Sequence, residues 1–98
     1  MKIRFHPEAQ REYEDAVSYY EERQGGLGRR FIFAVEHAFS SIRASPGRWP
    51  IMEEDIRRRL TPVFPYAVLY TVEEDHVLVL AIMHCRRKPG YWRRRRAT

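Results

Sequence analysis

The chain has 98 residues, of which 44% are hydrophobic and 32% are charged, and its formal net charge is +5. This length and composition suit one domain with its own core, which argues against disordered and fibrous classes. A single cysteine, Cys85, excludes an intramolecular disulfide and a cysteine-rich zinc site, and it fits a reducing, cytoplasmic setting. No segment approaches the roughly 18 apolar residues of a membrane span, so we expect no membrane contact.

The first half of the chain predicts a strand and a first helix. Residues 2–6 alternate apolar and polar side chains, which is typical of a strand with one face on a core. Pro7 suits the first position of a helix, where its missing N–H costs nothing. The apolar stripe of this helix comprises Ala9, Tyr13, Ala16, Val17 and Tyr20, and its polar face comprises Arg11, Glu12, Asp15, Glu22 and Arg23.

A second helix follows after a short glycine-rich break. Gly25 and Gly26 end the first helix, and residues 45–47 end the second. Because the connection is so short, the two helices should pack as an antiparallel hairpin. The second apolar stripe comprises Phe31, Ala34, Val35, Ala38 and Ile42, widened by Phe33 and Phe39.

The second half predicts three strands. Residues 48–55 have no clean period, and we expect a crossing loop anchored by Trp49. Residues 56–60, 66–72 and 77–83 have strand patterns, the last two joined by an acidic turn. The order β-α-α-β-β-β predicts an α+β fold with a three-stranded antiparallel meander and helices on one sheet face. The apolar residues of the other face argue for a partner there.

The positive charge is concentrated at the C-terminus. Residues 1–85 hold 11 basic and 13 acidic side chains, a net charge of −2, whereas residues 86–98 carry +7. A segment of one sign is typical of proteins that bind an anionic partner, either nucleic acid or an acidic protein. The alternative is a solvated end. We divide the chain into a domain over residues 1–92 and a basic tail over residues 93–98.

Most familiar catalytic and cofactor motifs are missing from the sequence. It has no phosphate-binding glycine loop, no His-Glu-x-x-His and no Gly-x-Ser-x-Gly. His84 and Cys85 are neighbours on a strand and should point to opposite faces, which disfavours a Cys–His pair. The acidic clusters at 53–55 and 73–75 lack a histidine at ligand spacing and are expected to be solvated loops. We therefore expect neither a metal ion nor a cofactor.

Basic and aromatic residues carry the remaining chemical signal. Guanidinium groups hold phosphates and aromatic rings stack on bases, so such a set predicts a surface for a nucleic acid or another anionic target. The residues concerned are Arg57, Arg58, Arg59, Arg86, Lys88, Trp92 and Arg93. If RNA binds there, His84 or Tyr91 could transfer protons while Arg87 and Arg58 stabilise a pentavalent phosphate, without a metal. Alternatively, Tyr91 and Trp92 close the core and the arginines are solvated.

The order of elements and several short stretches resemble the RelE/ParE superfamily of bacterial toxins. The longest stretch is residues 84–93, His-Cys-Arg-Arg-Lys-Pro-Gly-Tyr-Trp-Arg, at the end of the last strand. The others are Phe5-His6-Pro7-Glu8-Ala9, Tyr19-Tyr20-Glu21, Gly26-Leu27-Gly28 with Phe31, Pro46 with Trp49-Pro50, Ile56-Arg57-Arg58, and Phe64-Pro65-Tyr66 with Tyr70. Together they span nearly the whole chain.

This resemblance implies a cytoplasmic toxin of a type II toxin–antitoxin pair, neutralised by an antitoxin protein that wraps the helical hairpin and the sheet. RelE-like members cleave mRNA on the ribosome, whereas ParE-like members poison DNA gyrase. Arg87 matches an arginine of the nuclease branch and Tyr91 approximates its C-terminal tyrosine, but Ala67 stands where that branch has another arginine. The Pro89-Gly90-Tyr91-Trp92 ending is more similar to ParE-like and plasmid-stabilisation members. The resemblance therefore favours gyrase inhibition, with mRNA cleavage or a non-toxic nucleic-acid-binding module as alternatives.

Overall fold

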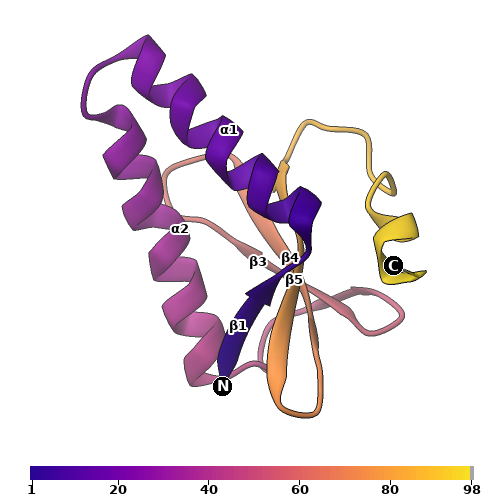
Figure 1. Ribbon diagram of the computed structural model, residues 1–98. Coiled ribbons are helices and arrows are strands. Elements are labelled where there is room, and N and C mark those ends of the chain that lie inside the picture. Colours follow the sequence, from indigo (N-terminus) through magenta and orange to yellow (C-terminus); the bar gives the residue numbers. More distant parts are fainter. Residues whose placement is uncertain (98) are drawn as a thin grey trace.

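The computed structural model describes residues 1–97 and shows an α+β fold in which two helices lie against a five-stranded sheet (Figure 1). In chain order the elements are β1 (Lys2–Phe5), α1 (Pro7–Arg23), α2 (Leu27–Ala44), β2 (Ile51–Glu53), β3 (Ile56–Leu60), β4 (Tyr66–Val72), β5 (His76–His84) and the 3-10 helix η1 (Arg93–Ala97). The predicted N-terminal strand, helical hairpin and last three strands are thus confirmed.

The sheet has the strand order β1-β5-β4-β3-β2. Strand β1 pairs with β5 in parallel, and the remaining neighbours are antiparallel. The central strands β4 and β5 are buried along most of their length because helices cover one face and the C-terminal segment covers the other. This explains their nearly continuous apolar sequences.

The predicted crossing loop over residues 48–55 is wrong in part. It contains the edge strand β2, which pairs with β3 and extends the meander to four strands. A tight turn at Glu54 and Asp55 joins the two strands, and Glu54 has a left-handed backbone with φ of 51°. A three-residue strand is too short to show a period in the sequence, which is why the pattern predicts a loop.

The helices begin and end close to the predicted residues. The side chain of His6 accepts a hydrogen bond from the N–H of Glu8, with Pro7 in the first turn of α1. Gly26, with φ of 89°, starts the turn into α2. The predicted α2 stripe is buried, but the expectation for Phe33 is wrong, since its side chain is 66% exposed.

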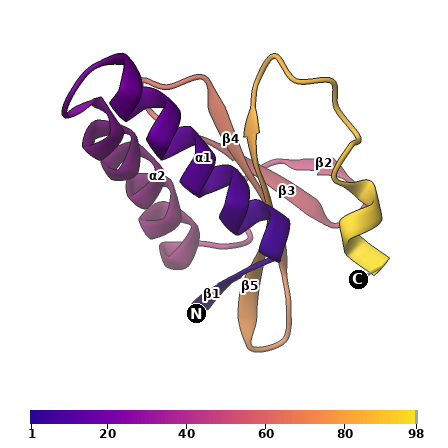
Figure 2. The ribbon, with the colours of Figure 1, turned by 45° about the horizontal axis from the view of Figure 1, so that its top comes forward.

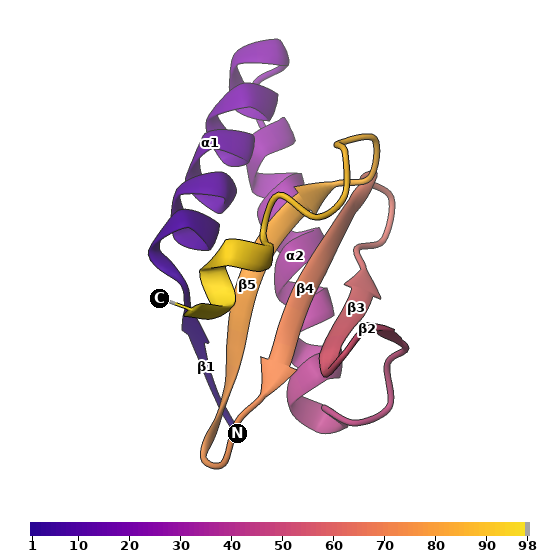
Figure 3. The same ribbon diagram turned by 90° about the vertical axis from the view of Figure 1, so that its right-hand side faces the viewer.

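A second correction concerns the sheet face opposite the helices, which the chain itself covers. After β5 the C-terminal segment turns back over the sheet, and η1 lies across β5 on the side away from α1 and α2 (Figures 2 and 3). Trp92 is fully buried there and packs in one cluster with Ile56, Leu69, Leu80, Ala81 and Met83. The apolar residues of this face are therefore explained by the protein's own C-terminus rather than by a partner.

Candidate functional site at the end of strand β5

His84 lies where β5 ends and points toward α1. Its ring packs edge-on against Tyr66, with 5.1 Å between ring centroids. Its Nδ1 accepts a hydrogen bond from the N–H of Arg86 at 3.0 Å, so Nε2 is the nitrogen left for proton transfer. His84 thus belongs to the helix side of the sheet and not to the face that Trp92 covers.

A groove of about 340 Å³ opens beside His84, between α1 and the end of β5. It brings a histidine, an arginine, two carboxylates and two tyrosines to one place. The residues that line it are Glu12, Asp15, Ala16, Tyr19, Tyr66, Ile82, His84 and Arg87. Two of the three predicted catalytic residues, His84 and Arg87, therefore share one site.

Arg87 is held by two contacts within the chain. Its guanidinium lies 3.4 Å from the centre of the Tyr91 ring, and its Nη1 is 3.3 Å from a carboxylate oxygen of Glu12. The Arg87 side chain nevertheless stays 52% exposed, so it remains accessible to an anion. The stacked, charge-paired geometry fixes the direction in which the guanidinium points.

Tyr91, the third predicted catalytic residue, is not among the residues that line the groove. Its hydroxyl is buried, and this burial, together with the nearby charge of Glu12, raises the pKa of the hydroxyl far above the ordinary value. Tyr91 serves mainly to support Arg87 and to close the second core cluster.

Glu12 and Arg95 connect the site to the rest of the fold. Arg95 Nη2 and Nη1 lie 2.9 and 3.0 Å from the two carboxylate oxygens of Glu12, and Arg95 is only 4% exposed. The same carboxylate accepts the N–H of Ile82 at 3.0 Å, and Arg95 Nη1 donates to the carbonyl of Leu80 at 2.8 Å. These two side chains satisfy backbone groups of β5 beyond Val79, where the pairing with β1 ends.

A β-bulge makes the Leu80 carbonyl available. Leu69 pairs with Ala81 and Tyr70 pairs with Val79, so Leu80 has no partner in β4. Glu12, on the predicted polar face of α1, therefore binds within the fold, through the N–H of Ile82 and the guanidinium of Arg95. The Glu12 carboxylate on α1 faces the part of β5 where backbone pairing is interrupted. The buried guanidinium of Arg95 donates to the Leu80 carbonyl there.

The four arginines of η1 all pair with carboxylates. Arg95 pairs with Glu12 and Arg94 with Glu8, whereas Arg93 and Arg96 reach Glu53 and Asp55 beside β2 and β3. Arg93 binds Glu53 through two 2.8 Å hydrogen bonds, which lower the pKa of that carboxyl. A 3-10 helix repeats every three residues, so its first and fourth arginines face the same way. The geometry thus does not favour the alternative of a freely solvated end, since all four side chains pair with carboxylates of the domain.

The arginines of β3 do not join this site. Arg57 donates to the carbonyl of Trp49 at 2.7 Å, and Arg59 donates to Ser41 Oγ at 2.9 Å and stacks on Trp49. Arg58 alternates to the opposite face, with Ile56 of the Trp92 cluster. The predicted joint action of Arg58 with His84 and Arg87 on one phosphate is therefore not supported by the geometry.

The remaining predicted binding residues divide into exposed and buried ones. Arg86 and Lys88 lie on the exposed turn after β5, next to Arg87. Trp92 is inaccessible, and Arg93 is occupied by Glu53 although its side chain is 62% exposed. Residues 86–88 are thus the part of the basic C-terminus that faces solvent beside the groove.

Sequence reasoning missed Glu12, Arg95, Tyr19 and Tyr66 as site residues. Glu8 and Glu12, spaced four apart on α1, give the only hint, since both can face one cationic partner. Within residues 1–97, no group of three or more His, Cys, Asp or Glu side chains gathers in a way that could hold a metal ion. In that same part of the chain, no helix is both long and apolar enough to cross a membrane.

Comparisons with known proteins identify the family. A search of curated proteins finds no match. Among solved structures, the chain is similar to one described as "Chromosomal ParDE TA system from P. aeruginosa", with 16% sequence identity and a TM-score of 0.65 over 86% of this chain and 95% of that one. Residues 3–89 match the family described as "ParE toxin of type II toxin-antitoxin system, parDE". The chain therefore belongs to the ParE toxins of type II toxin–antitoxin systems.

Proposed function

We propose that this ParE toxin acts in the cytoplasm by inhibiting DNA gyrase and that a cognate antitoxin protein neutralises it. The observation that carries the choice of target is the position of Tyr91. A ribonuclease without a metal needs side chains that reach the substrate and move its protons, whereas the Tyr91 hydroxyl is buried and its ring packs on the second core cluster outside the groove. The groove is thus better suited to binding than to cleavage.

Two further features support the same choice. Ala67, where the nuclease branch of the superfamily carries an arginine, is 1% exposed and pairs with Met83 inside the sheet. Arg58 faces the opposite side of the sheet from His84. The cationic groups that would surround a cleaved phosphate are therefore dispersed, while residues 86–88 form one accessible basic turn.

A supercoiling assay tests the target. Purified toxin, free of antitoxin, is added to gyrase with relaxed plasmid DNA and ATP. We expect loss of supercoiling or accumulation of a cleaved gyrase–DNA complex, reversed by adding the antitoxin. Unchanged supercoiling together with no trapped cleavage would refute gyrase as the target.

Cleavage of mRNA on the ribosome is the second candidate, because His84 lies in the same groove as Arg87 and its Nε2 makes no hydrogen bond within residues 1–97. This candidate requires His84, Arg87 and Tyr91 together. Primer extension on mRNA from cells that express the toxin would reveal cuts that recur in register with the reading frame. Growth arrest that survives alanine at all three positions would exclude this activity.

A further inference from the structure

Several arginines converge on Trp49, which lies just before strand β2. The guanidinium of Arg59 lies 4.2 Å from the centre of the Trp49 ring, and that of Arg48 lies 5.0 Å from it. Arg57 Nη1 donates to the Trp49 carbonyl at 2.7 Å. Arg58 lines a groove of about 240 Å³ together with Trp49 and Arg59. These five residues, which we call the Trp49 cluster, gather near the sheet edge opposite β1 (Figure 3).

The arginines of the Trp49 cluster have no carboxylate partner in the part of the chain that the structure describes. None of them forms an ion pair there, and the groove beside Trp49 has no acidic residue in its lining. Two acidic residues nearby in the chain are engaged elsewhere, since Glu53 pairs with Arg93 and Asp55 with Arg96. Like charges repel one another, so an external anion would relieve this gathering of cations.

The arginines of the C-terminus are arranged in the opposite way. Residues 93–96 all pair with carboxylates of the domain and hold η1 against the sheet. Their charge is neutralised within the fold. The charge of the Trp49 cluster is not, although the cluster lies in the half of the chain with the lower density of basic residues. It is therefore available to an anion from outside the molecule.

The guanidinium groups of the cluster keep free donors. Arg59 donates from Nε to Ser41 Oγ at 2.9 Å and from Nη1 to the carbonyl of Leu60 at 2.8 Å, which leaves both N–H groups of Nη2. Arg48 and Arg58 are exposed, and their guanidinium groups donate to no other group within residues 1–97. A guanidinium binds phosphate oxygens through paired N–H groups, and a donor that is already held in place loses less entropy on binding.

The cluster offers no free aromatic ring on which a base could stack. Trp49 is half-buried, guanidinium groups lie against its ring, and its Nε1 donates to the carbonyl of Ser41 at 3.4 Å. Proteins that bind single strands use accessible rings as stacking platforms, whereas contacts from arginine to phosphate suit a duplex and carry no sequence information. The geometry therefore matches the sugar–phosphate backbone of a duplex rather than its bases.

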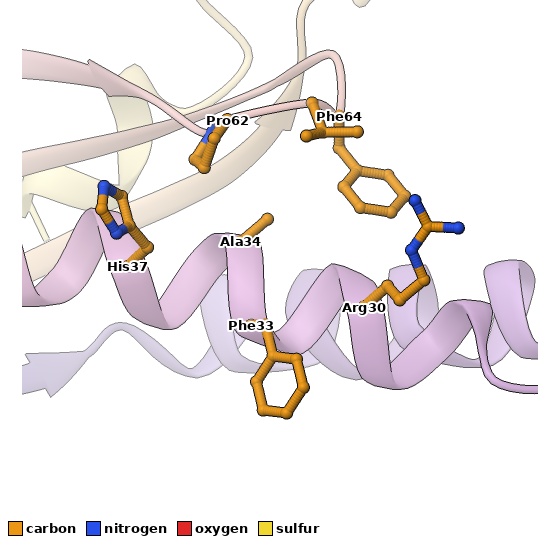
Figure 4. Close-up of a pocket in the computed structure, with 7 residues that line it drawn as sticks. Arg30, Phe33, Ala34, His37, Pro62 and Phe64 are labelled. Atoms are coloured by element: carbon orange, nitrogen blue, oxygen red, sulfur yellow. The ribbon is translucent and has the colours of Figure 1, made fainter.

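A larger groove between α2 and the loop after β3 has a different character. Its volume is about 410 Å³, and Figure 4 shows Arg30 and His37 along α2 facing Phe64 of the loop. Five of its seven lining residues are apolar, so it lacks the density of cations that a row of phosphates requires. Arg30 precedes Ser41 by eleven residues on α2, about 16 Å along the helix axis, and so lies outside the Trp49 cluster.

We propose that the Trp49 cluster binds the sugar–phosphate backbone of double-stranded DNA without sequence preference. Protein–protein interfaces have few charged residues at their centre, whereas surfaces that bind DNA are strongly positive. Four guanidinium groups around one indole fit the second class. The proposal goes beyond inhibition of gyrase, because it requires no gyrase; a toxin with this surface would hold the DNA that its target enzyme has bound.

Fluorescence anisotropy of a short labelled DNA duplex, measured with the full-length protein over a series of salt concentrations, tests the proposal. Arg48→Gln with Arg58→Gln removes two exposed cations that make no side-chain hydrogen bond, so the unfolding midpoint should stay unchanged. We expect the double variant to bind roughly tenfold more weakly at low salt. The slope of log affinity against log salt should become shallower by about 2, since each phosphate contact contributes about 0.9.

Two control variants remove the same charge elsewhere. Arg11→Gln with Arg30→Gln changes exposed helical positions, and Arg86→Ala with Lys88→Ala changes the basic turn after β5. Both should keep affinity for the duplex within about threefold and lose less of the salt slope than the cluster variant. Equal weakening in all three double variants overturns the proposal, because net charge alone would then explain the binding.

Polyglutamate is the probe for an acidic protein partner. If the wild-type protein binds polyglutamate more tightly than the duplex at equal charge and salt, and the cluster variant loses that binding, the surface serves an acidic protein and the proposal is overturned. A wild-type protein that binds no duplex at low salt overturns it as well. Neither outcome decides whether gyrase is the target, because the supercoiling assay measures that separately.

Discussion

Arg95 and Glu12 form a two-point ion pair between the C-terminal 3-10 helix and the first helix, with distances of 2.9 and 3.0 Å. The side chains are only 3% and 15% exposed. The same two side chains bind the backbone of β5 at Leu80 and Ile82, so one pair connects three parts of the fold. It also places Glu12 within reach of Arg87.

Replacing Arg95 by glutamine should destabilise the protein far more than the same change at Arg94. Loss of one partner from a buried pair leaves an uncompensated carboxylate and costs about 3 kcal/mol or more. Arg94 pairs with Glu8 but its side chain is 68% exposed, so Arg94→Gln should cost less than about 1 kcal/mol. Urea unfolding of both variants measures the difference. Equal losses would contradict the structural role of the Arg95–Glu12 pair.

Trp92 should be essential for stability rather than for contact with a target. Truncating a large buried aromatic to alanine costs about 3–5 kcal/mol, which is a large part of the stability of a domain of this size. Trp92→Ala should therefore unfold at much lower urea and bind a hydrophobic dye in its native state. The control is Trp49→Ala, because Trp49 is only half-buried at the edge of the helix-side core. A Trp92→Ala protein of wild-type stability would refute the proposed packing of the C-terminal segment.

The helical hairpin and the main strands could be predicted from the sequence because their signals are local. Pro7, the glycines at 25 and 26 and the α2 stripe each specify structure through neighbours in the chain. Strand β2 was not predictable, because three residues show no period. The position of the C-terminus depends on pairs between residues 40 or more apart in sequence, such as Arg93 with Glu53 and Arg95 with Glu12. A run of four arginines gives no local sign that carboxylates from two distant segments will meet it.

The exposed basic turn after β5 should matter for the target but not for folding. Arg86→Ala with Lys88→Ala removes two exposed cations next to the groove. We expect the double variant to need several-fold more protein for the same inhibition of gyrase, because cations at an interface mainly raise the association rate. Arg29→Ala with Arg43→Ala on α2 removes the same charge elsewhere and serves as the control. If the two double variants lose equal potency, net charge rather than this turn determines inhibition.

Alkaline pH should unfold the protein between about pH 10 and pH 12. Burial raises the pKa of Tyr66 and of Tyr70 to about 12, and burial also raises the pKa of Tyr13 and Tyr91. A folded-state pKa above the unfolded value of about 10 means that the folded state holds the proton more tightly. The stability that these tyrosines contribute is therefore fully present below pH 10 and is lost as the pH rises toward 12.

Absorbance at 295 nm and circular dichroism, followed together, measure this transition. We expect tyrosinate absorbance from the buried rings to appear only as the circular dichroism signal is lost. In guanidinium chloride the same rings should titrate smoothly near pH 10. Lysine deprotonation contributes little, because the chain has only Lys2 and Lys88 and both are exposed. If all six tyrosines of the native protein ionise near pH 10 without unfolding, the buried environments described for Tyr66, Tyr70 and Tyr91 are wrong.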